Sequence, residues 1–110
     1  FWVILHPDIT SKNSIVSEFK PLDPLLHSQL RLAVMSLLLS VEEAEFTFIK
    51  EKTESTAGNL SVQLDKLEKA GYLAIEKSFR GKRPLTTCKI TQKGVKAFEA
   101  YVENLKNYIS

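Results

Sequence analysis

The apolar residues of this chain change their spacing at Gly71. Upstream of it, Leu60, Leu64 and Leu67 recur three and four residues apart, which predicts a helix over residues 57–69 with one buried side. Gly71 itself stands where a helix commonly ends in left-handed backbone. The residues beyond it follow the period of a strand, so a helix must lead directly into β-structure.

Downstream of Gly71, apolar and polar side chains alternate in two segments, which predicts two half-buried strands. Leu73, Ile75 and Phe79 are the apolar positions of the first strand, and residues 86–90 form the second. Residues 80–84, with the sequence RGKRP, form the turn between them. The two strands therefore make a hairpin with a basic tip.

Two helices are expected before this unit. The first covers residues 24–40, with Asp23 as its cap and Pro24 at its first position. It is apolar over most of its circumference, so it must be covered on more than one face. Residues 42–45 form an acidic turn, and a short helix over residues 46–53 follows.

A last helix is expected from about Gly94 to Tyr108. Its apolar residues keep heptad spacing for two heptads, at Val95, Phe98, Val102, Leu105 and Ile109. This stripe packs either against the first helix of the same chain or against a second subunit. The first helix has more apolar surface than one core can use, including Leu25, Leu32 and Met35, which favours a homodimer interface.

Charge is concentrated in one part of the sequence. The whole chain carries a net charge of +2, but residues 76–96 hold seven Lys and Arg against Glu76 alone, giving 7 − 1 = +6. Such a local excess is expected where a protein contacts a polyanion. A solvated hairpin with ordinary surface lysines is the alternative explanation.

This order of elements is that of a winged helix-turn-helix, an α+β fold that is mainly α. Residues 25–32 (LLHSQLRL) and 58–73 (GNLSVQLDKLEKAGYL) resemble small MarR/ArsR-like regulators, as does Thr91-x-x-Gly94 with the aromatic and leucine residues that follow it. The resemblance covers about residues 22–109. It implies a transcriptional regulator that binds double-stranded DNA and dimerises through its terminal helices.

The helix at 57–69 is the expected recognition helix. At 100° per residue, its polar side chains and lysines lie opposite the three leucines, so they can enter a major groove. Polar side chains near its start are expected at base edges, and lysines near its end at phosphates. Around the hairpin tip, cations are expected on a minor groove or the flanking backbone. The DNA-contacting residues predicted in this way are Ser55, Thr56, Asn59, Val62, Gln63, Lys66, Lys69, Lys77, Arg80, Lys82 and Arg83.

The sequence offers little for catalysis or for a cofactor. No serine or threonine has a positioned histidine, no phosphate-binding glycine loop is present, and His6, His27 and Cys88 lack the paired spacing of metal ligands. We therefore expect neither an enzyme nor a metal or cofactor. Cys88 is expected to be a buried structural residue, with a redox sensor as the alternative. A single cysteine suits a reducing compartment, which favours the cytoplasm.

Residues 1–20 lack a sustained period and are expected to form an arm before a domain at 21–110. The apolar run at residues 1–5 is far shorter than the ~20 residues of a membrane helix. Because the sequence begins at Phe1, an upstream segment is an open alternative. Two further hypotheses concern function: a winged helix that binds proteins instead of DNA, within a larger or membrane-attached chain, and a small-molecule effector between the first and last helices.

Overall fold

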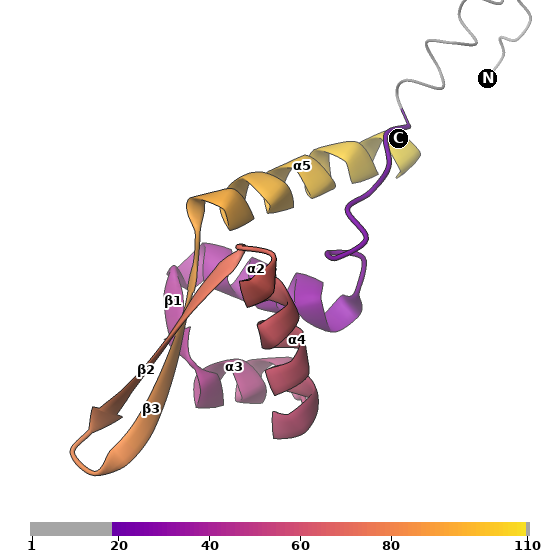
Figure 1. Cartoon of the computed structure of the whole chain (residues 1–110). Helices are drawn as coiled ribbons and strands as arrows, with labels where there is room; N and C mark the ends of the chain where they lie inside the picture. The colour runs from indigo at the N-terminus through magenta and orange to yellow at the C-terminus, as the bar shows by residue number, and fades with distance from the viewer. Residues whose placement is uncertain (1–18, 110) are drawn as a thin grey trace, which may run out of the picture.

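A computed structural model describes residues 19–109 (Figure 1). Most of the predicted arm lies outside them. The order of elements confirms the predicted winged helix, with its C-terminal helix in place, and the three strands form one antiparallel sheet in the order β1-β3-β2. The elements are α2 (Gln29–Val41), β1 (Glu43–Glu45), α3 (Phe46–Thr53), α4 (Ala57–Lys69), β2 (Leu73–Arg80), β3 (Arg83–Ile90) and α5 (Gln92–Ile109).

The first helix begins later than predicted. Asp23 accepts a hydrogen bond from the backbone N–H of Leu25 at 3.0 Å, and this bond closes a turn instead of capping a helix. The cap is Ser28, whose hydroxyl accepts from the backbone N–H of Arg31 at 3.4 Å. The turn places Leu26 in the core, fully buried. A helix starting at Pro24 was therefore wrong, because the turn and the serine cap compete successfully for this segment.

The acidic segment at residues 42–45 is not only a turn. Glu42 has a φ of 72°, which turns the chain out of α2, and Glu43–Glu45 then pairs with β3 as strand β1. Glu43 lies opposite Lys89 in this register, an arrangement of opposite charges that stabilises a strand pair. Three residues carry too little alternation to reveal a strand, so the prediction of a turn was wrong here.

The hairpin is longer and its turn tighter than predicted. β2 and β3 pair as far as Arg80 opposite Arg83, which leaves a two-residue turn whose Gly81 has a φ of 65°. Pro84 lies in β3 beyond the end of β1, where one edge of the strand has no neighbour and a missing N–H is tolerated. Phe79 was expected to be half-buried but is 72% exposed, because the hairpin extends past the core.

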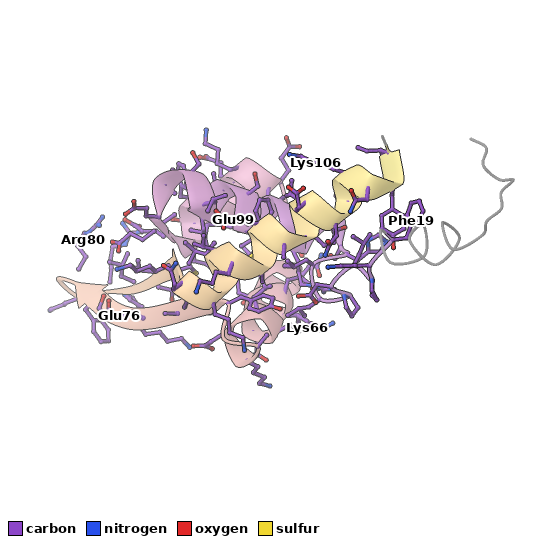
Figure 2. The ribbon with its side chains drawn as sticks, turned by 90° about the horizontal axis from the view of Figure 1, so that it is seen from above. Phe19, Lys66, Glu76, Arg80, Glu99 and Lys106 are labelled. Carbon is purple, nitrogen blue, oxygen red and sulfur yellow. The ribbon has the colours of Figure 1, made fainter. Side chains whose placement is uncertain are left out.

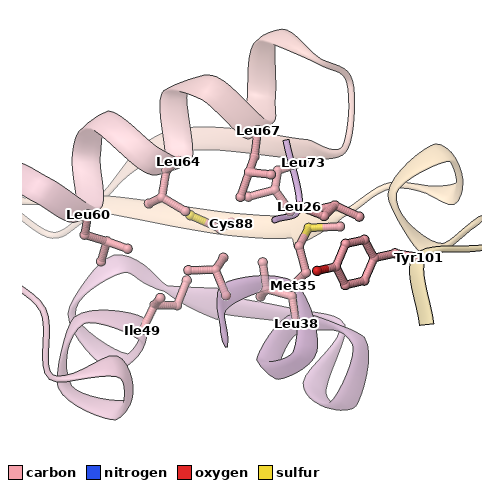
Figure 3. Packing of buried hydrophobic residues seen from close by; sticks show 11 residues of the cluster. Leu26, Met35, Leu38, Ile49, Leu60, Leu64, Leu67, Leu73, Cys88 and Tyr101 are labelled. Atoms are coloured by element: carbon pink, nitrogen blue, oxygen red, sulfur yellow. The ribbon is translucent and has the colours of Figure 1, made fainter. Parts of the chain in front are cut away.

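The core lies between α2, α3, α4 and the sheet (Figure 3). Leu60, Leu64 and Leu67 of α4 all point into it, as the leucine spacing predicts. Cys88 faces them from β3 and is fully buried, which confirms its structural placement. Helix α4 is thus fixed from behind by side chains of α2, α3 and the sheet, and its opposite side is free to face outward.

The start of α5 is fixed by a close backbone contact. Thr91 donates a hydrogen bond from its hydroxyl to the carbonyl oxygen of Gly71 at 2.6 Å, and the same hydroxyl accepts from the N–H of Gly94 at 3.0 Å. A Cβ on Gly94 would lie 2.3 Å from the carbonyl oxygen of Tyr72. The Thr91-x-x-Gly94 motif therefore docks the last helix onto the chain just after the end of α4.

The last turn of α5 extends beyond the core (Figure 1). Near its end, the ring of Tyr108 meets Phe19 edge-on with centroids 5.3 Å apart, and its hydroxyl donates to the carbonyl oxygen of Lys20 at 2.7 Å. The chain before α2 thus runs beside the end of α5. No helix among the described residues is both long enough and apolar enough to cross a membrane.

Candidate nucleic-acid interface

The turn between α3 and α4 is built from local hydrogen bonds. α3 ends at Thr53, and the next residue, Glu54, has left-handed backbone with a φ of 53°. The hydroxyls of Thr53 and Ser55 are 2.9 Å apart, and Thr56 caps α4 by accepting from the backbone N–H of Asn59 at 3.1 Å. Ser55 and Thr56 therefore already support the turn, and only their remaining hydrogen-bonding capacity is available to a ligand.

The outward side of α4 is polar and exposed, as predicted. Asn59, Val62, Lys66 and Lys69 all lie on it, and Val62 is 51% exposed. The ammonium group of Lys69 forms an exposed ion pair with the carboxylate of Asp65 at 3.0 Å, one turn earlier. An exposed pair of this kind is weak, so Lys69 can exchange its partner for a phosphate at little cost.

Gln63 lies at the edge of this side and is held by a residue that the sequence did not indicate. Arg31 of α2 donates from its Nη1 to the side-chain oxygen of Gln63, and from its Nε to the carbonyl oxygen of Leu25. Gln63 in turn donates from Nε2 to Oδ1 of Asn59 at 3.0 Å. Arg31 is the only charged residue in α2, and this isolated charge was the one sequence feature that could have indicated its role.

The strand register divides the predicted hairpin residues between two faces. Lys77 lies on the face that carries Ile75 and, at the base of the hairpin, the buried Leu73, so it points to the α4 side. Arg80 and Arg83 lie on the opposite face, and Lys82 occupies the turn. The hairpin therefore presents cations on both of its faces and at its tip. It forms one end of the molecule, where Arg80 and Glu76 are labelled in Figure 2.

Arg80 has a partner outside the hairpin. Its Nη2 lies 2.9 Å from Oε2 of Glu45, the last residue of β1, and the side chains are 68% and 38% exposed. This ion pair holds the hairpin arginine back toward the body of the domain. Sequence reasoning missed it because the strand that carries Glu45 was predicted to be a turn.

Two pKa shifts bear on the chemistry of the domain. Burial, with a smaller contribution from Glu68, raises the pKa of the Cys88 thiol to about 11. The thiolate is the reactive form, so this shift argues against the redox-sensor alternative. Burial and the neighbouring Asp23 carboxylate, to which its hydroxyl donates, raise the pKa of Tyr72 to about 12. Among residues 19–109, no three His, Cys, Asp or Glu side chains gather in a way that could hold a metal ion.

The residues proposed for a dimer interface differ in how accessible they are. Met35 is fully buried in the chain's own core, so it has no surface to offer a partner. Leu25, Leu32, Phe98 and Leu105 are half-buried and pack against that core, and Val95 is also half-buried. The accessible members are Val102, 36% exposed, and Ile109, 77% exposed, both on α5.

Comparison with known proteins places this geometry in a family. A family model described as a winged helix DNA-binding domain matches residues 30–109, from α2 to the end of α5. The chain belongs to this winged-helix family. An uncharacterised protein of Methanocaldococcus jannaschii is 40% identical over 78 residues, which cover 71% of this chain and 85% of that protein.

Solved structures agree with the family assignment. A transcriptional regulator homologue from Pyrococcus horikoshii OT3 is 27% identical, with a TM-score of 0.74 over 92% of this chain and 95% of that one. A mutant MarR from E. coli in complex with operator DNA is 20% identical, with a TM-score of 0.65 over 87% and 66% of the two chains. The winged-helix chain therefore has a MarR-like fold, and its family is one of DNA-binding domains and not of enzymes.

Proposed function

We propose that this winged-helix protein is a transcriptional regulator that binds a specific double-stranded DNA sequence as a homodimer. The observation that carries the proposal is the position of α4. Its three leucines are buried, its opposite side is polar and exposed, and a basic hairpin lies beside it. In this proposal α4 enters the major groove and the hairpin contacts the flanking groove or backbone.

The roles of the individual residues follow from their placement. Asn59, Gln63, Ser55 and Thr56 approach base edges near the N-terminal end of α4, and Val62 contacts apolar base surface such as a thymine methyl group. The remaining members of the predicted set are cations that contact phosphates, and they position the protein without reading sequence. These cations are Lys66, Lys69, Lys77, Arg80, Lys82 and Arg83.

The dimer is supported by the apolar surface that α5 leaves exposed, at Val102 and Ile109. A two-fold dimer would present two copies of α4 to half-sites about 34 Å apart, one turn of the DNA helix. The structure of MarR with operator DNA supports DNA as the partner of this fold.

Selection of bound duplexes from a random pool, with the purified full chain, tests the proposal. The expected result is an enriched pseudo-palindrome whose half-sites are one helical turn apart. Enrichment of a single half-site would argue against the dimer. Absence of any duplex binding at low salt would overturn the regulator and favour a winged helix that binds proteins.

A small-molecule effector is a further part of the proposal. A cavity of about 290 Å³, lined by Leu22, Pro24, His27 and Tyr108, lies between the turn before α2 and the end of α5. A compound bound there would contact both segments and could alter the dimer. A compound that weakens operator binding by the wild type and fails to do so with Leu22→Trp, which fills the cavity, would establish this site.

A further inference from the structure

Three side chains link α2 to the outward side of α4. Arg31 is held at two points, since its Nε donates to the carbonyl oxygen of Leu25 while its Nη1 donates to Gln63. Gln63 then donates to Asn59 at 3.0 Å. Gln63 and Arg31 are half-buried, whereas Asn59 is exposed. The series therefore runs from the body of the domain to the surface that we propose faces DNA.

Donor and acceptor chemistry fixes how both amides point. A guanidinium has only donors, so the atom of Gln63 that faces Arg31 must be its oxygen. The nitrogen of Gln63 then faces Asn59, which must answer with its own oxygen. Within residues 19–109, Nδ2 of Asn59 has no hydrogen-bond partner. The two amides consequently present N–H donors to any ligand on this side of α4.

This polarity disfavours the usual amide contact with adenine relative to a contact with guanine. A bidentate amide contact with adenine needs one donor for N7 and one acceptor for the N6 amino group. The oxygen of Gln63 accepts from Arg31 and the oxygen of Asn59 accepts from Gln63, so each oxygen keeps one lone pair, whereas Asn59 keeps both of its N–H donors. Guanine presents two acceptors, N7 and O6, and so suits a pair of donors.

We infer that Arg31 is a specificity-determining residue, which orients the amides of Gln63 and Asn59 as donors and so makes α4 select guanine over adenine in each half-site. The inference rests on the proposed function, because it requires α4 to face base edges. Arg31 acts through Gln63 and is a positioning residue. It determines which atoms of the recognition helix are offered to the base.

Selection of bound duplexes with wild type and Arg31→Met tests the inference. The wild type is expected to prefer guanine over adenine at one half-site position by roughly 5- to 150-fold, the range for a bidentate contact. In Arg31→Met, Gln63 is free to turn its oxygen toward DNA, so adenine should become nearly as good as guanine. Lys66→Met is the matched control, since it removes a cation from the same surface without touching the amides. It should weaken binding to all sequences and leave the base preference unchanged.

A uniform loss of affinity in Arg31→Met, with the guanine preference intact, would overturn the inference, and so would a wild type that selects adenine at every position. Thermal unfolding establishes whether Arg31→Met is folded. Gln63→Glu provides a second test that does not depend on the folding of Arg31→Met. A glutamate retains the contact with Arg31 but has no N–H donor, so guanine should lose its advantage and cytosine, whose amino group donates, should gain it. An unchanged guanine preference in Gln63→Glu would also overturn the inference.

A measurement without DNA separates the two proposals. The side-chain amide resonances of Gln63 and Asn59 in free, ¹⁵N-labelled protein should both shift in Arg31→Met and stay in place in Lys66→Met. If they shift but the wild type binds no duplex, the hydrogen-bonded series exists and the regulator proposal fails, together with the role in base selection. If the wild type binds DNA and neither resonance responds, the regulator stands and the inference about Arg31 is overturned.

Discussion

At the scale of single residues, the two sides of α4 differ in what they can do. The leucines of α4 are buried and set its position, while Asn59 is exposed and already polarised by Gln63. A residue on the outward side can therefore change DNA selection with little effect on folding. This separation makes the outward side accessible to single substitutions.

Asn59→Ala is expected to cost about 1–3 kcal/mol of binding free energy at the preferred DNA site and far less on unrelated DNA, because a base contact is lost. Fluorescence anisotropy with specific and scrambled duplexes measures the difference. Ser61→Ala, an exposed position of α4 that lies nearer the leucine side, is the control and should leave both affinities unchanged. Equal losses on both duplexes would show that Asn59 contacts only the DNA backbone.

Gly94→Ala is expected to lower the free energy of unfolding by about 1–3 kcal/mol, because its Cβ would collide with the carbonyl oxygen of Tyr72 and α5 would have to shift. Urea titration measures the loss. Gly58→Ala is the matched control, since a Cβ there meets nothing within 4 Å. It should be neutral or stabilising by about 0.5–1 kcal/mol. Equal stability of the two variants would contradict the close contact at Gly94.

At the scale of elements, segments that carry their own periodic pattern were predictable, and a strand that depends on a distant partner was not. Helical spacing predicted α3 and α4 closely because each carries its own apolar side and turn residues. β1 has three residues and gains its stability from pairing with β3, which is distant in sequence. The ion pair between Arg80 and Glu45 depends on that pairing. The contact between Arg31 and Gln63 likewise needs the crossing of α2 and α4, which local patterns do not contain.

The hairpin cations should make DNA binding salt-sensitive. Each phosphate contact contributes about 0.9 to the slope of log affinity against log salt concentration. Replacing Arg80, Lys82 and Arg83 with Ala should therefore flatten the slope by about 2 to 3 and weaken binding to all sequences. Affinity measurements from low to physiological salt provide the slope. An unchanged slope would exclude the hairpin from the interface.

The Arg80–Glu45 ion pair should compete with DNA. Glu45→Gln removes the carboxylate that competes with DNA phosphates for Arg80, so binding to all duplexes should tighten, and more than in the control variant. Glu76→Gln is the matched control, since it removes the same charge from the same face of the hairpin without touching Arg80. If both variants tighten binding equally, the loss of one negative charge explains the effect and the ion pair has no specific role.

At the scale of the whole molecule, the domain has two ends with different surfaces. One end carries the basic hairpin with Arg80, and the other carries the end of α5, where Phe19 lies (Figure 2). An interface at the α5 end would leave both recognition helices uncovered. The two proposed functions, dimerisation and DNA contact, are therefore compatible within one assembly.

The double variant Val102→Asn and Ile109→Asn tests the interface directly. Burying an aliphatic side chain contributes about 1.5–3 kcal/mol, and in a two-fold dimer each substitution acts twice. The dimer dissociation constant should rise by two orders of magnitude or more, measured by sedimentation equilibrium. Thermal unfolding checks that the monomer remains folded, because Ile109 is 77% exposed within one chain but Val102 is only 36% exposed.

Glu99→Asn and Glu103→Asn together form the matched control on the same helix, with exposed polar residues replaced by the same amide. The control should remain dimeric and bind the full operator as the wild type does. The Val102→Asn and Ile109→Asn double variant should still bind an isolated half-site, because α4 and the hairpin are untouched. It should lose the added affinity of a second half-site. A dimer that survives in the double asparagine variant would place the interface elsewhere on the chain. The geometric basis for half-sites one turn apart would then be lost.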